Sequence, residues 1–115
     1  SSSILEEVRL VLQVNPQIRK VRIEGHTDDR GSDKFNLDLS QRRAETVMKW
    51  LMDGGIEADR LSAEGLGETR PLVPNDSPEN LQQNRRVEFH IVDPAPKQGA
   101  SDVLDPTATQ EEGAP

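Results

Sequence analysis

The 115-residue chain is acidic, with 14 Lys and Arg against 21 Asp and Glu, a net charge of -7, no cysteine and 3% aromatic residues. This length fits one small domain with an aliphatic core, and the lack of cysteine excludes disulfides, thiolate catalysis and cysteine-ligated zinc. Nucleic-acid binding requires dense basic patches, and a membrane span requires roughly 20 apolar residues. We therefore expect no nucleic-acid partner and no membrane insertion by this chain.

Hydrophobic spacing predicts a helix followed by a strand at the start of the chain. Apolar residues recur three and four positions apart over residues 3–14, and Asn15-Pro16 ends the helix because proline disfavours helical geometry in the residue before it. Residues 20–25, KVRIEG, then alternate between apolar and polar side chains, as in a half-buried strand. This alternation places Glu24 on the exposed face.

A second helix is predicted from Asn36 to about Met52, where the period returns to 3.6 residues. Its core-facing stripe is predicted to contain Leu37, Ala44, Val47, Met48 and Leu51. Asn36, Arg43 and Trp50 form a second stripe on the flank of the helix, whereas Arg42 falls nearly opposite the core. The two adjacent arginines are therefore not equivalent, and we expect Arg42 to be solvated.

After Gly54-Gly55 the pattern predicts a strand over residues 58–66, a proline-rich loop, a short helix at 77–84 and a last strand at 85–92. A strand, a crossover helix and a second strand form a βαβ unit, so the first two strands should be parallel. The last strand should place Val87, Phe89 and Ile91 inside and His90 outside.

Residues 93–115 differ in composition from the rest of the chain. They hold five acids and one base, which is -4 of the net charge, and their only large apolar residues are Val103 and Leu104. Such a segment buries too little apolar surface to order itself. We predict a domain at residues 1–92 and a flexible Pro-rich acidic tail at 93–115.

The charged stretch after the first strand raises the question of a metal site. His26, Asp28 and Asp29 offer three donors, but zinc sites usually use several imidazoles, and only one other histidine, His90, is present. Both histidines fall on the predicted outer face of a strand, where we expect exposed side chains. A metal-dependent hydrolase using these three residues is the weakest of the functions considered, and no metal ligands or cofactors are predicted.

Opposite charges offer a second interpretation of the same stretch. Asp28 follows a strand, Arg43 lies on the next helix, and Arg85 begins the last strand. Arginine binds a carboxylate through two bonds and aspartate accepts from an ammonium, so the set suits a zwitterionic ligand. The alternative is that Asp28 and Arg43 form a structural salt bridge, as in a protein-interaction module.

The motifs GHTDDRG, LSQRRA at residues 39–44, GLGETRP and NRRVEF at residues 84–89 together resemble the OmpA-like C-terminal domain. This domain also occurs in peptidoglycan-associated lipoproteins and flagellar-motor stator proteins. The match covers about residues 4–92. The resemblance implies an α/β two-layer fold with helices packed on a mixed sheet, from which the family's first strand is missing in this chain.

The resemblance also implies a function and a binding site. The family is non-enzymatic, so no catalytic residues are expected, and it binds peptidoglycan through the meso-diaminopimelate of the stem peptide. By position, Asp28 pairs with the ammonium of this residue and Arg43 with its carboxylate. Asn36 and Arg85 would line the same pocket, with wall or main-chain contacts from Thr27 and Leu39.

A location follows from this ligand. We expect a periplasmic domain of a Gram-negative envelope protein that is associated with the outer membrane and anchors the envelope to the cell wall. Whether the parent is a barrel, a lipoprotein or an inner-membrane protein stays open. A homodimer is one assembly that the sequence leaves open.

Overall fold

The computed structural model describes residues 2–95 and 101–104. The helices and strands, in chain order, are α1 (Ser2–Val14), β1 (Lys20–His26), α2 (Asp33–Asp53), the 3-10 helix η1 (Ala58–Arg60), β2 (Leu61–Gly67), α3 (Pro78–Asn84) and β3 (Arg86–Asp93). Each element predicted from the sequence is present. Two boundaries differ by three residues: α2 begins earlier than predicted because Ser32 caps it and accepts from the Phe35 N–H, and β2 begins later because residues 58–60 form η1.

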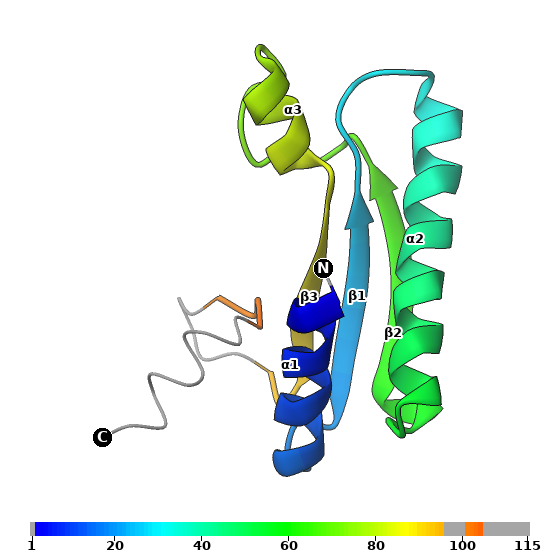
Figure 1. The fold of residues 1–115 in the computed structure, drawn as a ribbon, viewed down its shortest axis with the longest axis vertical. Coiled ribbons are helices and arrows are strands. Elements are labelled where there is room, and N and C mark those ends of the chain that lie inside the picture. Colours follow the sequence, from blue (N-terminus) through cyan, green and yellow to red (C-terminus); the bar gives the residue numbers. More distant parts are fainter. Residues whose placement is uncertain (1, 96–100, 105–115) are drawn as a thin grey trace.

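The three strands form one mixed sheet in the order β2-β1-β3. β1 pairs in parallel with β2, as predicted for a βαβ unit, and antiparallel with β3. Helices α1 and α2 lie side by side on one face of the sheet, with α2 along β1 and β2 (Figure 1). The predicted α/β architecture, with helices packed on a mixed sheet, is confirmed.

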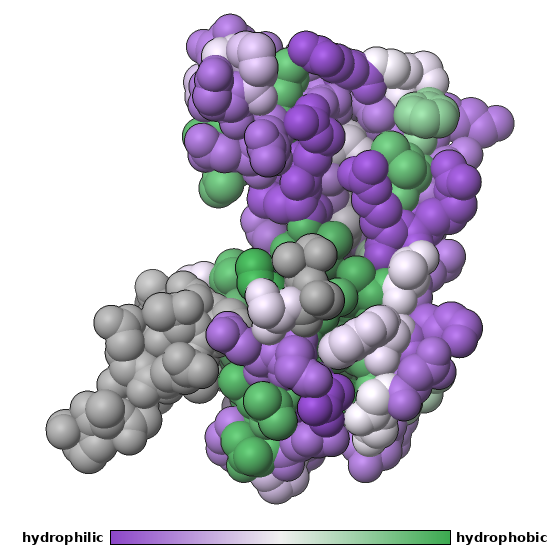
Figure 2. Space-filling model, viewed as in Figure 1, coloured by the Kyte–Doolittle hydropathy of each residue, from purple (hydrophilic) through white to green (hydrophobic). Residues whose placement is uncertain are grey.

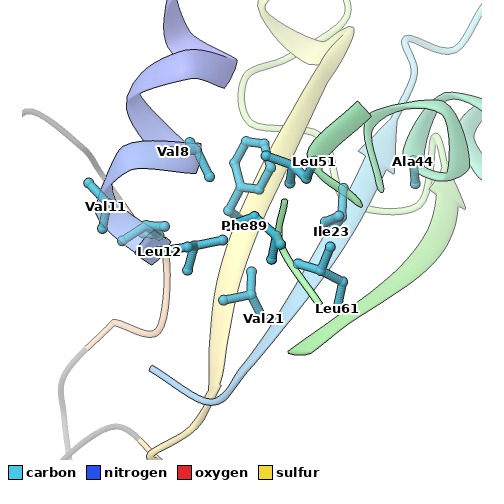
Figure 3. Close-up of a cluster of buried hydrophobic side chains, with 11 residues drawn as sticks. Val8, Val11, Leu12, Val21, Ile23, Ala44, Leu51, Leu61 and Phe89 are labelled. Carbon is cyan, nitrogen blue, oxygen red and sulfur yellow. The ribbon is translucent and has the colours of Figure 1, made fainter. Parts of the chain in front are cut away.

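The hydrophobic core fills the space between these two helices and the sheet. Val8 and Leu12 of α1 reach toward Phe89 of β3, and Leu51 of α2 meets Ile23 of β1 (Figure 3). All five side chains are buried. The core is therefore aliphatic apart from one phenylalanine ring, as the composition requires.

Two glycines allow α2 to lie unusually close to the sheet. A Cβ on Gly25 of β1 would lie 2.2 Å from the backbone oxygen of Ser40, and one on Gly65 of β2 would lie 2.3 Å from the backbone nitrogen of Gln41. Ser40 Oγ also accepts from the Gly67 N–H at 2.9 Å. The first turns of α2 are thereby fixed against the ends of both strands, where the binding site was predicted.

The burial of α2 differs in part from the predicted stripe. Ala44 and Leu51 are fully buried, but Leu37 is about half exposed, and Asn36 is buried instead. The helix begins beyond the edge of the hydrophobic core, so its first apolar position does not reach that core. No helix among the described residues is long and apolar enough to span a bilayer.

The face of the sheet opposite the helices is buried along its middle, although the side chains of Ser62 and Glu64 on β2 are exposed. Glu24, His26 and His90 lie on this face and are buried, so the expectation of exposed side chains at these positions is wrong. Burial and the neighbouring Arg86 lower the pKa of His26 below its ordinary value of 6.5. Burial also lowers the pKa of His90, but hydrogen bonds with Asp102 and Glu88 outweigh it and leave this pKa raised.

Part of the predicted flexible tail pairs with β3 through an isolated β-bridge. The Ile91 N–H donates to the Asp102 oxygen, the Leu104 N–H donates to the Phe89 oxygen, both at 2.6 Å, and Val103 bridges His90 in antiparallel register. Leu104 is buried in the core. The prediction of a flexible tail is therefore wrong for residues 101–104. Residues 96–100 and 105–115 lie outside the described part of the chain.

Candidate functional site

The predicted site lies at the end of the sheet where β1 leads into α2 and α3 leads into β3, at the top of Figure 1. The loop between β1 and α2 is held to the neighbouring strand because the Thr27 N–H donates to the Gly67 oxygen at 2.8 Å. Gly31 has a φ of +88°, a conformation that favours glycine, and lets the loop turn into α2. This loop therefore presents Asp28 in a fixed position.

Asp28 is a buried carboxylate that is held from two sides. Its Oδ2 accepts from Arg85 Nη1 at 2.6 Å, and its Oδ1 accepts from the Arg30 N–H at 3.0 Å. Its side chain is 8% exposed, whereas that of Arg85 is 40% exposed. Burial raises the pKa of Asp28, but the hydrogen bonds from Arg30 and Arg85 outweigh it and bring the pKa below its ordinary value of 3.8.

Asn36 and Thr27 support this loop from within. Asn36 Nδ2 donates to the Asp28 main-chain oxygen at 3.3 Å and to Glu68 Oε1 at 3.1 Å. Thr27 Oγ1 donates to the same Asp28 oxygen at 2.8 Å. Both side chains are buried, so in this structure they position Asp28 and are not open to a ligand.

Arg43 lies on the exposed flank of α2, as predicted, and lines a hollow of about 440 Å³. Arg85 and Arg86 line the same hollow, whose remaining wall is apolar: Ile4, Leu5, Val47, Val87 and Phe89. In Figure 2 this apolar surface lies near the centre of the view, between the polar surfaces of α3 and α2. The hollow thus combines guanidinium groups with an apolar wall.

A neighbouring hollow of about 320 Å³ continues this surface along α2. It shares Arg43, Val47 and Val87 with the first hollow and adds Leu39 and Arg42. Arg42 is exposed, as predicted, but its position beside Arg43 means that it also faces this surface. Asp28 lines neither hollow. It is connected to the first hollow through its ion pair with Arg85, which lines that hollow.

The salt bridge between Asp28 and Arg43, which was considered from the sequence, is absent from the described residues. Asp28 pairs instead with Arg85, 57 residues away, and no ion pair or hydrogen bond of the Arg43 side chain is found within residues 2–95 and 101–104. The pairing that supported a protein-interaction module is therefore wrong. As far as the described part of the chain is concerned, the Arg43 guanidinium is available to a ligand.

The three metal donors considered from the sequence, His26, Asp28 and Asp29, do not come together either. His26 Nε2 points to Glu24 and Glu88 on the charged face of the sheet, whereas Asp28 pairs with Arg85 at the end of the sheet. Asp29 is exposed. The structure thus does not support the constellation on which a hydrolase was considered.

One positioning residue was not identified from the sequence. Asn84, fully buried at the end of α3, accepts from the Leu72 and Val73 N–H groups and donates to the Val73 oxygen and to Asn75 Oδ1. These hydrogen bonds fix the proline-rich loop to the end of α3, directly before Arg85. Its place at the start of the NRR motif was the only sequence signal for such a role.

Comparison with known proteins identifies the family. The OmpA family model matches residues 1–85, and the chain belongs to this family. Outer membrane protein A of Bordetella avium is 38% identical over 97 residues, which are 79% of this chain and 50% of that protein. Photosystem I P700 chlorophyll a apoprotein A2 of Gloeobacter violaceus is 49% identical over 77 residues, 62% of this chain but only 9% of that protein. This chain therefore spans half or less of these relatives.

Solved structures agree with this assignment. The peptidoglycan-associated lipoprotein of Burkholderia pseudomallei has a TM-score of 0.69 and 34% identity, covering 74% of this chain and 71% of that chain. The described fold is thus the fold of this family's solved members.

Proposed function

We propose that this chain binds peptidoglycan without covalent attachment and without catalysis, through the meso-diaminopimelate of the stem peptide. The observation that carries the proposal is the hollow in which the Arg43 guanidinium has no partner among residues 2–95 and 101–104 and Arg85 pairs with the buried Asp28. Membership of the OmpA family and the similarity to a peptidoglycan-associated lipoprotein support it.

The charges of the site match the two charges of the diaminopimelate side-chain end. Arg43 would bind the carboxylate through two hydrogen bonds, and Asp28 would accept from the ammonium. Arg85 already pairs with the Asp28 carboxylate. The ammonium must therefore share this carboxylate with Arg85 or displace the partly exposed Arg85 side chain. The apolar wall of the hollow would contact the methylene groups between the charges.

The proposal also assigns a location. A domain that binds peptidoglycan must face the cell wall, which in Gram-negative bacteria places it in the periplasm. Similarity to outer membrane protein A of Bordetella avium supports association with the outer membrane. The chain would then anchor that membrane to the wall.

Co-sedimentation with purified sacculi tests the proposal. Each charge-paired hydrogen bond contributes about 1.5–3 kcal/mol, so Arg43→Ala and Asp28→Ala should each weaken binding by roughly tenfold or more. Lys49→Ala is the matched control for Arg43, since Lys49 is an exposed cation of α2 that pairs only with Asp53 among the described residues. Asp29→Ala is the control for Asp28.

Arg43→Ala is the decisive variant because the Arg43 side chain forms no hydrogen bond or ion pair with the described residues. Wild-type co-sedimentation by a folded Arg43→Ala protein would contradict the proposed site. A titration with soluble muropeptides adds the ligand side of the test. Peptides with lysine in place of diaminopimelate lack the carboxylate that Arg43 would hold and should bind more weakly.

A further inference from the structure

A cluster of ionisable side chains lies on the face of the sheet opposite the helices, away from the proposed peptidoglycan site. Glu24 comes from β1, Glu88 and His90 from β3, and Asp102 from the segment that pairs with β3. Glu24 and His90 are buried, and Glu88 is partly buried. Sequence spacing alone gave no sign that these four side chains meet.

Three of these residues direct one donor atom each toward a common point. His90 Nε2 lies 2.8 Å from Glu88 Oε1 and 3.1 Å from Glu24 Oε1, and the three donor atoms lie within 4.8 Å of one another. Two ligands on a tetrahedral zinc ion at about 2.0–2.1 Å are about 3.4 Å apart. The distances from His90 Nε2 to the two carboxylate oxygens would therefore lengthen by about 0.3–0.6 Å to admit an ion.

Each of the three donors is held from behind by a second group. Arg22 Nε donates to the other oxygen of Glu24 at 2.6 Å, and Arg86 Nε donates to the other oxygen of Glu88 at 2.6 Å. Asp102 Oδ1 lies 2.7 Å from Nδ1 of His90, the nitrogen that faces away from the common point. Carboxylates that hold the second nitrogen of a histidine in this way are typical of metal sites, where they fix the ring and its tautomer.

The charges of the cluster leave room for a cation. The carboxylates of Glu24, Glu88 and Asp102 exceed the guanidinium groups of Arg22 and Arg86 by one negative charge when His90 is neutral. A divalent cation among these side chains would be bound by the neutral form of His90, the form in which histidine is a metal ligand.

His26 lies beside the cluster but does not complete it. Its Nε2 is 3.2 Å from Glu24 Oε1 and 3.7 Å from Glu88 Oε1. Its buried Nδ1 has no hydrogen-bond partner among the described residues, so ligation through Nε2 would leave a buried N–H unpaired. We therefore place His26 in the wall of the site and leave the fourth position to a water molecule.

We propose that Glu24, Glu88 and His90 form a binding site for a divalent transition-metal cation, with Zn²⁺ as the preferred ion. Zinc binds both imidazole nitrogen and carboxylate oxygen and so accepts this set, although most zinc sites use more than one histidine, whereas Mg²⁺ and Ca²⁺ prefer oxygen ligands in larger number. The site would join β1, β3 and, through Asp102, the segment 101–104. It goes beyond the peptidoglycan proposal and does not depend on it.

Calorimetric titration of the tag-free, EDTA-treated full chain with ZnCl₂ tests this site. We expect one zinc ion per chain and no comparable heat with MgCl₂. His90→Gln removes a ligand and should weaken binding by at least tenfold. Asp102→Asn removes only the group behind His90 and should weaken it by about ten- to a hundredfold.

Glu64→Gln is the matched control, because this exposed carboxylate lies 3.8 Å from Arg22 but outside the ligand set. It should bind zinc as the wild type does. Absence of saturable 1:1 binding, or unchanged binding by Asp102→Asn, would overturn the proposal. Circular dichroism would establish that each variant is folded, and if His90→Gln were not, Asp102→Asn alone would decide, since its side chain is 33% exposed.

Discussion

At the residue scale, Asp28 combines a structural contact with a proposed binding role. It is almost fully buried, and its partner Arg85 lies 57 residues later in the chain. The pair therefore joins the loop after β1 to the start of β3. Loss of Asp28 should affect stability as well as binding, whereas loss of Arg43, which forms no ion pair with the described residues, should affect binding alone.

Asp28→Asn should lower the free energy of unfolding by about 1–2 kcal/mol at pH 7. A hydrogen bond to a charged group contributes about 1.5–3 kcal/mol, and solvent at the 40% exposed Arg85 reduces this value. Because the pKa of Asp28 is lowered on folding, its contribution is complete above its unfolded pKa of about 3.8 and is lost as the pH falls through the folded pKa. Urea unfolding across this range measures the effect.

The free energy of unfolding of the wild type should exceed that of Asp28→Asn by an amount that is constant from neutral pH down to about pH 4. This advantage should shrink below pH 4. Asp29→Asn, at the exposed neighbouring carboxylate, should show no such advantage at any pH. Equal stability of the wild type and Asp28→Asn at pH 7 would show that the ion pair with Arg85 does not contribute.

At the element scale, the contact between α2 and the sheet determines where the site residues lie. Gly25 and Gly65 remove the side chains that would otherwise separate the helix from β1 and β2. The close contact also lets Ser40 and Gln41 donate to or accept from backbone groups of β2. The helix can therefore present Asn36 beneath the Asp28 loop and Arg43 at the edge of the hollow.

Gly25→Ala should destabilise the protein by about 3 kcal/mol, at the upper end of the usual effect of overpacking. The added Cβ would meet the backbone oxygen of Ser40 at 2.2 Å, so the helix and the strand must move apart. Chemical denaturation measures the change. Gly54→Ala is the control, since its Cβ would meet the flexible side chain of Arg9 and the residue has an ordinary φ of -83°. Similar effects of the two substitutions would contradict the close-packing argument.

At the scale of the whole molecule, the segment 101–104 covers the outer edge of β3. It pairs with the backbone of Phe89 and Ile91 and adds Leu104 to the core. Unpaired strand edges promote association between chains. The segment therefore stabilises the sheet and protects it from edge-to-edge pairing.

Removal of residues 96–115 should lower the free energy of unfolding by about 2–4 kcal/mol, because a buried leucine contributes roughly 1.5–3 kcal/mol and two backbone hydrogen bonds are lost. The truncated chain should also associate at high concentration. Urea unfolding and sedimentation velocity measure the two effects. Removal of residues 105–115 keeps the paired segment 101–104 and is the control. Equal stability of the two truncated chains would show that residues 101–104 contribute nothing.

The elements and the family were accessible from the sequence because they depend on local patterns. The 3.6-residue period predicted α2, alternation predicted β1 and β3, and the order of the motifs around Asp28, Arg43 and Arg85 indicated the OmpA family. These signals arise from residues near one another in the chain. They also placed Arg43 on an exposed flank of its helix, where the structure has it.

Other features were decided by contacts between distant segments. Alternation shows which side of a strand a residue faces, but not whether that side is covered, so Glu24, His26 and His90 were wrongly expected to be exposed. The partner of Asp28 is Arg85 rather than Arg43, because the turn from α3 into β3 brings Arg85 to the loop after β1. The sequence by itself thus determined the elements and the candidate charges, whereas the tertiary structure determined their burial and pairing, because both depend on distances in space.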